Sequence, residues 1–184
     1  MIHVGTDKRR VKSAQLLADA LIRCMEQKDF TQINVSDLQR ESGVSRATFY
    51  RLFDNVQDVL SYQCQEISDA LTVKYQENRE SAEEGFLQFT LRYLCAHHAL
   101  LEAIFKVGRA DILQQAVLRN AWFLKEQAPF RYLPEESFDY VLAASIGIFG
   151  NVLMVWVQHG QKETPEELIE IFRSVGELSP LLIH

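Results

Sequence analysis

The sequence predicts an all-α protein in which a small N-terminal three-helix domain is joined by a long helix to a larger helical domain. Apolar residues recur at helical spacing along almost the whole chain, and no run alternates apolar and polar residues as a half-buried strand would. Glycine and proline are sparse, at eight and four residues, so few positions interrupt a helix. A sharp turn at Gly43 separates two short helical patterns within the first domain.

Composition limits the class of protein. A chain of 184 residues with 47% hydrophobic content can bury a sizeable core, as one medium domain or as a small domain fused to a larger one. The net charge is −6, but residues 1–60 carry nine basic against eight acidic residues, whereas residues 61–184 carry ten against seventeen. The acidic charge therefore lies away from the N-terminal region, which is left able to approach a polyanion.

The first helix is predicted from Asp7 to about Lys28, because an apolar stripe there has the i, i+3, i+7, i+10 spacing of one helix face. The stripe consists of Ala14, Leu17, Leu21 and Cys24.

Signals for two short helices and a tight turn follow. Asn34 has a side-chain oxygen that accepts N–H groups at a helix start, and Asp37 suits the positive end of the helix dipole. Gly43 provides the left-handed residue that ends a helix sharply, and Ser45 caps the next helix.

The helix after Ser45 has one apolar side and one polar side. Phe49 and Phe53 are four residues apart and lie on its inner side. Asn55, with Asp58 three residues later, starts a further helix. A short helix, a Gly turn and a second short helix bearing Arg, Thr and Tyr form a helix-turn-helix that reads DNA. The outward residues are Arg46, Ala47, Thr48, Tyr50 and Arg51.

One stretch, GVSRATFYRLF from Gly43 to Phe53, resembles the signature of the TetR/AcrR-family transcriptional regulators. The match covers roughly residues 8–60, and the turn, the Phe-Tyr pair and Phe53 make it specific. The resemblance implies a DNA-binding domain over residues 1–55 and a helical effector-binding and dimerisation domain over residues 56–184. It also implies a homodimer, usually a repressor, that binds double-stranded operator DNA and leaves it when a small-molecule effector binds.

The predicted DNA surface combines two kinds of contact, since phosphate contacts position a protein and base-edge contacts specify sequence. In the family, residues that match Thr48 and Tyr50 commonly touch the backbone, and Asn34 offers an amide at a helix start. The guanidinium groups of Arg46 and Arg51 can bridge the two acceptors of guanine. Ala47 permits close approach or contact with a thymine methyl group, and the basic residues Lys8, Arg9 and Arg10 precede the first helix. The predicted DNA-binding residues are Arg10, Asn34, Ser45, Arg46, Ala47, Thr48, Tyr50 and Arg51.

Two positions depart from the family pattern. Val56 stands where the first turn of the connecting helix usually has Lys, which removes a cation that would meet phosphate. Leu52 stands where His or Tyr is common. The alternative function is therefore a DNA-incompetent relative, an interaction protein that modulates another regulator.

The remaining helices are predicted from periodicity and from breaks. A long helix from Val56 to about Glu77 connects the two domains. Thr164, Pro165 and Glu167 form a capping box with proline at the first helical position, which opens the last helix. Between them we expect helices at about Glu83–His98, Leu100–Phe105 and Asp111–Gln127, breaks at Pro129 and Pro134, and a long apolar helix over Glu135–Gln158.

Aromatic residues recur in the second domain, where the resemblance implies a pocket for a small, usually apolar effector. Each ring taken singly also fits an ordinary core position. The predicted ligand-binding residues are Phe89, Tyr93, Phe105, Trp122, Tyr140 and Phe149.

The last two helices are predicted to pair with their copies in a second chain. Ala143, Gly147 and Asn151 recur at i, i+4, i+8 and form a shallow face that permits close helix approach. A two-fold dimer places the two reading helices about one DNA turn apart (~34–36 Å), which predicts a pseudo-palindromic operator. The competing interpretation is an intramolecular bundle. The predicted interface residues are Ala143, Gly147, Asn151, Leu168, Ile171, Phe172 and Val175.

Other classes of protein fit the sequence poorly. The uncharged segment Val141–Val157 is at the short limit for a membrane span, and we expect it to be a helix buried on most sides. Three scattered cysteines without a CxxC motif, and an N-terminus without an apolar signal, favour the cytoplasm. Cys95, His98 and Glu102 have a spacing that a metal could use but lack a fourth ligand. With no catalytic motif, we predict neither an enzyme nor a cofactor, and no catalytic or metal site.

Overall fold

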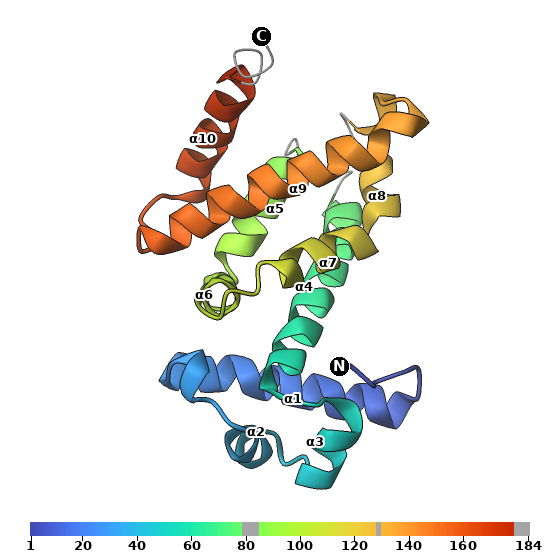
Figure 1. The fold of residues 1–184 in the computed structure, drawn as a ribbon, viewed down its shortest axis with the longest axis vertical. Helices are drawn as coiled ribbons and strands as arrows, with labels where there is room; N and C mark the ends of the chain where they lie inside the picture. Colours follow the sequence, from blue (N-terminus) through green and yellow to red (C-terminus); the bar gives the residue numbers. More distant parts are fainter. Residues whose placement is uncertain (79–84, 128–129, 179–184) are drawn as a thin grey trace.

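The computed structural model describes residues 1–78, 85–127 and 130–178. Throughout these ranges the regular structure is helical, with ten α-helices, two 3₁₀ turns and no strand (Figure 1). The predicted all-α class is confirmed. The predicted helix start at Glu83 and the predicted break at Pro129 lie outside the described residues.

Three helices form the N-terminal part, here called the head. The helix α1 (Lys8–Gln27) lies across the head, with α2 (Val35–Ser42) and α3 (Arg46–Leu52) beneath it (Figure 1). The apolar stripe predicted for α1 is buried throughout, in one cluster with residues of all three helices. The side chains that close this core include Leu17, Leu21, Leu38, Phe49 and Phe53, all 1% exposed or less.

The helix α4 (Val56–Asn78) rises from the head into the larger part of the chain, here called the body. The core of the head continues along α4 and includes Leu100 and Ile104 of α6, so head and body share one apolar cluster. The division into domains at residue 55 remains a prediction. The body helices are α5 (Phe86–Cys95), α6 (His98–Lys106), α7 (Asp111–Arg119), α8 (Ala121–Lys125), α9 (Glu135–Gln158) and α10 (Pro165–Leu178).

One predicted helix is divided in two, because the chain bends between α7 and α8 at Asn120 (φ −102°, ψ 17°). The buried side-chain amide of Asn120 donates to the Ser68 hydroxyl at 3.1 Å and to an Asp69 carboxylate oxygen at 2.9 Å, both on α4. The single helix expected over residues 111–127 is therefore corrected. A buried amide needs partners, and these two lie on a helix distant in sequence.

The long helix α9 crosses the body, and α10 extends away from it (Figure 1). The predicted bounds of α9 are confirmed, and Thr164 and Glu167 form the predicted capping box at the start of α10. A second apolar cluster joins α5, α6, α9 and α10, and a third joins α8 to the first half of α9. These clusters cover only part of α9.

Candidate nucleic-acid interface

The start of α2 is held by a capping box. The Asn34 side-chain oxygen accepts the backbone N–H groups of Ser36 at 3.0 Å and Asp37 at 3.2 Å, and the Asp37 carboxylate accepts the Asn34 N–H at 3.0 Å. The predicted cap is therefore confirmed. Asn34 remains exposed, although its oxygen is engaged in capping.

Asp37 is a buried carboxylate with basic partners on two helices. Lys28 at the end of α1 pairs with one carboxylate oxygen, and Arg40 donates to the other at 2.9 Å. The hydrogen bond from Lys28, followed by the one from the Asn34 N–H, lowers the pKa of Asp37 to about 2. Arg40, which the sequence analysis did not select, is thereby held on the outer side of α2.

The turn between α2 and α3 has the predicted geometry. Gly43 has φ +71°, a left-handed conformation that favours glycine, and Val44 is buried behind it. The Ser45 hydroxyl accepts the Thr48 backbone N–H at 3.2 Å and lies 3.0 Å from the Thr48 hydroxyl. Ser45 is thus the cap of α3, and both hydroxyls lie at the beginning of this helix.

Packing fixes which side of α3 faces solvent. Phe49 and Phe53 are buried with ring centroids 6.1 Å apart, as predicted, which leaves Arg46, Ala47 and Arg51 exposed together with Tyr50. The reading face is defined here as the exposed residues of α2 and α3 that can approach a nucleic acid. Its residues are Arg40, Arg46, Ala47, Tyr50 and Arg51.

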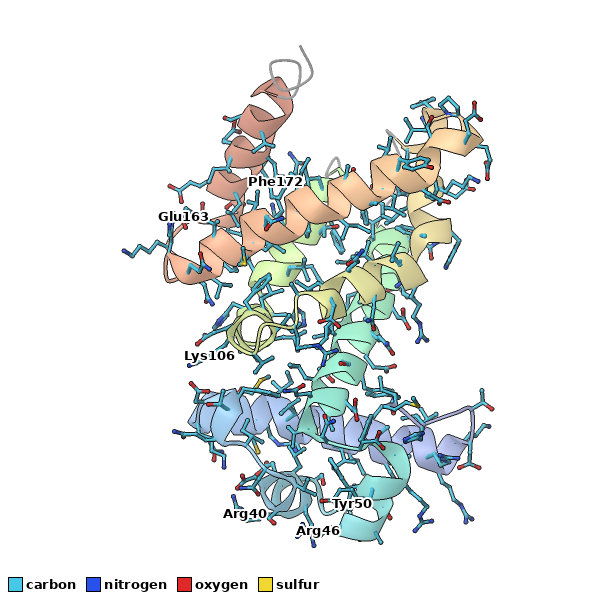
Figure 2. All side chains as sticks on the ribbon, viewed as in Figure 1. Arg40, Arg46, Tyr50, Lys106, Glu163 and Phe172 are labelled. Atoms are coloured by element: carbon cyan, nitrogen blue, oxygen red, sulfur yellow. The ribbon has the colours of Figure 1, made fainter. Side chains whose placement is uncertain are left out.

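The reading face lies at the end of the head that points away from the body, where Figure 2 labels Arg40, Arg46 and Tyr50. The Arg46 guanidinium lies 5.7 Å from the centre of the Tyr50 ring and donates to its hydroxyl at 3.4 Å. Among the residues that the structure describes, neither Arg46 nor Arg51 forms an ion pair with a carboxylate. Both cations are therefore available to an anionic partner.

Arg10 has a different environment, because its guanidinium donates to the backbone carbonyls of His3 and, at 3.3 Å, of Arg51. The two departures from the family pattern also have structural reasons. Leu52 is 1% exposed and fills the core of the head, and Val56 packs half-buried against the same cluster.

The six predicted ligand-binding aromatics are not brought together. Phe89 and Tyr93 stack on α5 with ring centroids 6.2 Å apart, and Tyr75 of α4 lies 5.4 Å from Phe89. The prediction of one shared pocket is corrected, because Trp122 is 62% exposed and Tyr140 is 81% exposed, too open to line an enclosed site. Phe105 and Phe149 are half-buried against the second apolar cluster.

A cavity of about 220 Å³ lies elsewhere, between the end of α1 and α6. None of the six predicted aromatics lines it, and two of its lining residues, Lys106 and Asp29, form an ion pair. Its lining residues are Met25, Lys28, Asp29, Phe30, Ala99, Glu102, Ala103 and Lys106. Within the described residues, no three His, Cys, Asp or Glu side chains lie close enough together to hold a metal ion, and this includes Cys95, His98 and Glu102.

Of the predicted interface residues, Ala143, Gly147 and Asn151 are exposed on α9, and Ile171 on α10 is 40% exposed. Val175 and Phe172 are half-buried, and the Phe172 ring stacks on Phe149 at 5.3 Å. The assignment of Leu168 to the interface is corrected. Its side chain is 1% exposed because it fills the second apolar cluster within the chain.

The apolar helix α9 is much less buried than predicted. By length and composition alone it is apolar enough to cross a membrane, over a stretch of 18 residues. Only 17% of this apolar stretch of α9 is buried inside the chain, which corrects the expectation of a helix buried on most sides. The exposed side carries Tyr140, Ile148 and Val155 in addition to the small residues.

Comparison with known proteins relates both sequence and fold to regulators. No family model matches the chain. The chain is 34% identical over 187 aligned residues to YxbF of Bacillus subtilis (strain 168), an uncharacterized HTH-type transcriptional regulator. This alignment covers 90% of the chain and 45% of the relative, so the chain spans less than half the length of the curated relative that it matches.

Solved structures match the fold. Lin0861 from Listeria innocua aligns with a TM-score of 0.72 and 19% identity, over 96% of this chain and 98% of that one. The fatty acid degradation regulator FadR from Bacillus halodurans aligns with a TM-score of 0.58 and 19% identity, over 90% and 93% of the two chains. The sequence comparison therefore relates the chain to an HTH-type transcriptional regulator, and the two solved structures show that it shares their fold.

Proposed function

We propose that this chain, which has a TetR-like helix-turn-helix fold and is related in sequence to an HTH-type transcriptional regulator, is itself a DNA-binding transcriptional regulator. The observation that carries the proposal is the reading face. A short helix is anchored by two buried phenylalanines and presents two arginines and a tyrosine to solvent, at the end of the molecule away from the acidic body.

The proposed roles follow from the chemistry of each side chain. Arg46 and Arg51 read base edges, because a guanidinium bridges the two acceptors of guanine. Tyr50 and Thr48 contact phosphate through their hydroxyls, and Ala47 allows α3 to approach the major groove closely. Asn34 and Ser45 stand at the starts of α2 and α3, where helix dipoles favour phosphate. Arg40 adds a cation beside this surface.

We also propose that the protein acts as a homodimer through α9 and α10. The support is the exposed apolar side of α9, because an apolar surface of this extent on a monomer is typical of an interface. Small residues at Ala143 and Gly147 permit close approach of the partner helix. The proposed interface residues are Ala143, Gly147, Asn151, Ile171, Phe172 and Val175, with Ile148 and Val155 added from the structure.

Release from DNA requires the body to influence the head, and α4 is the connection that we propose. The Ser68 hydroxyl of α4 donates to the Ala116 carbonyl at 3.1 Å, and Arg109 donates to the Gln57 side chain at 3.3 Å. A small apolar effector bound near Phe89 and Tyr93 of α5, where Phe89 lies against Tyr75 of α4, would shift α4 and thereby the spacing of the two heads. A ligand changes this equilibrium only by its different affinity for the two states. Repression relieved by the effector is the proposed outcome, in the cytoplasm and without a cofactor or enzymatic step.

The second candidate function is a DNA-incompetent protein that modulates another regulator. Val56 favours it, because the first turn of α4 lacks a cation at that position. The two candidates differ in one measurable property, which is specific, salt-dependent DNA binding.

The test is binding of the purified protein to a labelled duplex from upstream of its own gene, followed by fluorescence anisotropy across a salt series. We expect specific binding that weakens steeply with salt, and a loss of about ten-fold or more in both Arg46→Ala and Tyr50→Ala. Lys162→Ala, an exposed cation beyond α9, is the matched control and should bind like the wild type. Equal affinity of wild type and both variants for this duplex and for fragments of a genomic library would contradict DNA reading.

A further inference from the structure

The residues that precede α1 pack onto the end of the DNA-reading helix. His3 donates its backbone N–H to the Leu52 carbonyl at 2.8 Å, and Ile2 pairs with Phe53 in an isolated antiparallel bridge. Val4 is 6% exposed and belongs to the same core cluster as Phe53. Residues 2–4, here called the N-terminal segment, therefore lie along the C-terminal end of α3.

Arg10 joins this segment to α3. It lies in the first turn of α1, and the same guanidinium nitrogen donates to the His3 carbonyl and to the Arg51 carbonyl. One side chain thus bridges the N-terminal segment and the helix that carries the reading face.

These contacts provide hydrogen-bond donors for carbonyl groups at the end of α3. The last carbonyl groups of an α-helix have no partner within the helix, and a helix of seven residues is too short to be stable by itself. Here the Leu52 carbonyl accepts from His3 and the Arg51 carbonyl accepts from Arg10. The positive charge of Arg10 also lies at the negative end of the helix dipole.

We propose that Arg10 is a positioning residue for DNA reading. It acts through the N-terminal segment and the carbonyls of α3 to fix the orientation of the reading face, and it makes no phosphate contact of its own. This assignment replaces the prediction that Arg10 contacts DNA. The expected effect of Arg10 on DNA binding rests on the proposed function, whereas its expected effect on hydrogen exchange in the free protein does not.

The two roles predict different salt dependences. A side chain that neutralises a phosphate releases a counterion, so its removal lowers the slope of log K against log salt by about 0.9. A positioning residue weakens binding at every salt concentration and leaves that slope unchanged. Arg9 is the matched control, because it is an exposed arginine one position earlier in α1.

The experiment compares wild type with Arg10→Ala, Arg9→Ala, His3→Pro and the His3→Pro/Arg10→Ala double variant. His3→Pro removes the N–H that bonds to Leu52 without changing the charge on α1. Arg10→Ala and His3→Pro should each weaken specific DNA binding by about ten-fold with an unchanged salt slope. The double variant should lose little more than either single one, because both changes release the same N-terminal segment from the end of α3.

Hydrogen exchange of the free protein provides the second readout. The amides of residues 50–53 should exchange about ten-fold faster in Arg10→Ala and His3→Pro, and at the wild-type rate in Arg9→Ala. Exchange in α9 should not change in any variant, which separates local release of α3 from a general loss of stability.

A salt slope lowered by about 0.9 in Arg10→Ala, with unchanged exchange at residues 50–53, would overturn the proposal and make Arg10 a phosphate contact. If the wild type binds no DNA specifically, the proposed function fails, and the exchange of residues 50–53 still decides whether Arg10 positions α3.

Discussion

The head and the helix α9 differ in how much of their apolar surface is buried within one chain. In the head, each helix turns its apolar side into a closed core and leaves a polar side exposed, as α3 does with Arg46 and Tyr50. In α9 the exposed side is itself apolar, with Ile148 at 47% and Val155 at 43% exposure. A single chain therefore completes the fold of the head but leaves α9 with a surface that a second apolar surface would cover.

The two regions also differ in whether side chains form hydrogen bonds at the starts of their helices. In the head, the caps at Asp7, Asn34 and Ser45 are formed by side chains that bond the helix starts. In α9 the cap residue is Pro134, which provides no side-chain hydrogen bond. The head is thus fixed by local polar contacts as well as by its core, whereas α9 depends on packing along its length.

The largest expected effect is loss of the core of the head. Phe53 is fully buried, with its ring centroid 5.7 Å from that of Tyr62 on α4. Phe53→Ala should lower the free energy of unfolding by about 3–5 kcal/mol, because it leaves a cavity in a closed core. Urea denaturation followed by circular dichroism measures the change. Tyr50→Phe on the exposed side of α3 is the control, and a loss below about 1 kcal/mol in Phe53→Ala would argue against a closed core.

The next effect concerns the exposed side of α9. Ile148→Glu should leave the free energy of unfolding of the monomer nearly unchanged, because the side chain is not buried within the chain. In the proposed dimer it would bury an unpaired charge, which should raise the dimer dissociation constant by about 100-fold.

Sedimentation equilibrium of Ile148→Glu measures this change. Leu118→Glu, an equally exposed apolar residue on α7, is the matched control and should remain dimeric. A wild type that sediments as a monomer, or an Ile148→Glu variant as dimeric as the control, would mean that this side of α9 is not the interface.

The smallest effect tests the polar contacts of the head. The pKa of Asp37 is lowered to about 2 from the ordinary value of 3.8, chiefly by the hydrogen bond from Lys28. A carboxylate with a lowered pKa stabilises the folded state above its ordinary pKa, and this stabilisation is lost as pH falls through the folded value. Asp37→Asn should therefore reduce stability by about 1 kcal/mol at neutral pH.

The difference between wild type and Asp37→Asn should shrink between about pH 4 and pH 2, where Asp37 takes up its proton. Denaturation midpoints of both proteins at several pH values give the comparison. A difference that does not change down to pH 2 would mean that the charge of Asp37 contributes nothing.

Much of the head follows from its sequence, because its signals act over three or four residues. The capping pair Asn34–Asp37, the left-handed Gly43 and the cap Ser45 each bond to groups within the same turn. The spacing of Phe49 and Phe53 fixes the buried side of α3, and hence the exposed side as well. Arg40 was missed although its partner Asp37 lies three residues earlier on α2, because the position of Arg40 beside α3 depends on how the two helices pack.

The sequence alone determined the helical class, the bounds of α9, the turn at Gly43 and the residues that α3 exposes, since all of these depend on short-range periodicity and capping. Only the tertiary structure decided the break at Asn120, the exposure of Trp122 and Tyr140, the burial of Leu168 and the carbonyl partners of Arg10. Each of these depends on contacts between residues far apart in the sequence, such as Asn120 with Asp69 and Arg10 with Arg51. Periodicity tells which side of a helix is apolar, but only the arrangement of helices decides what covers that side.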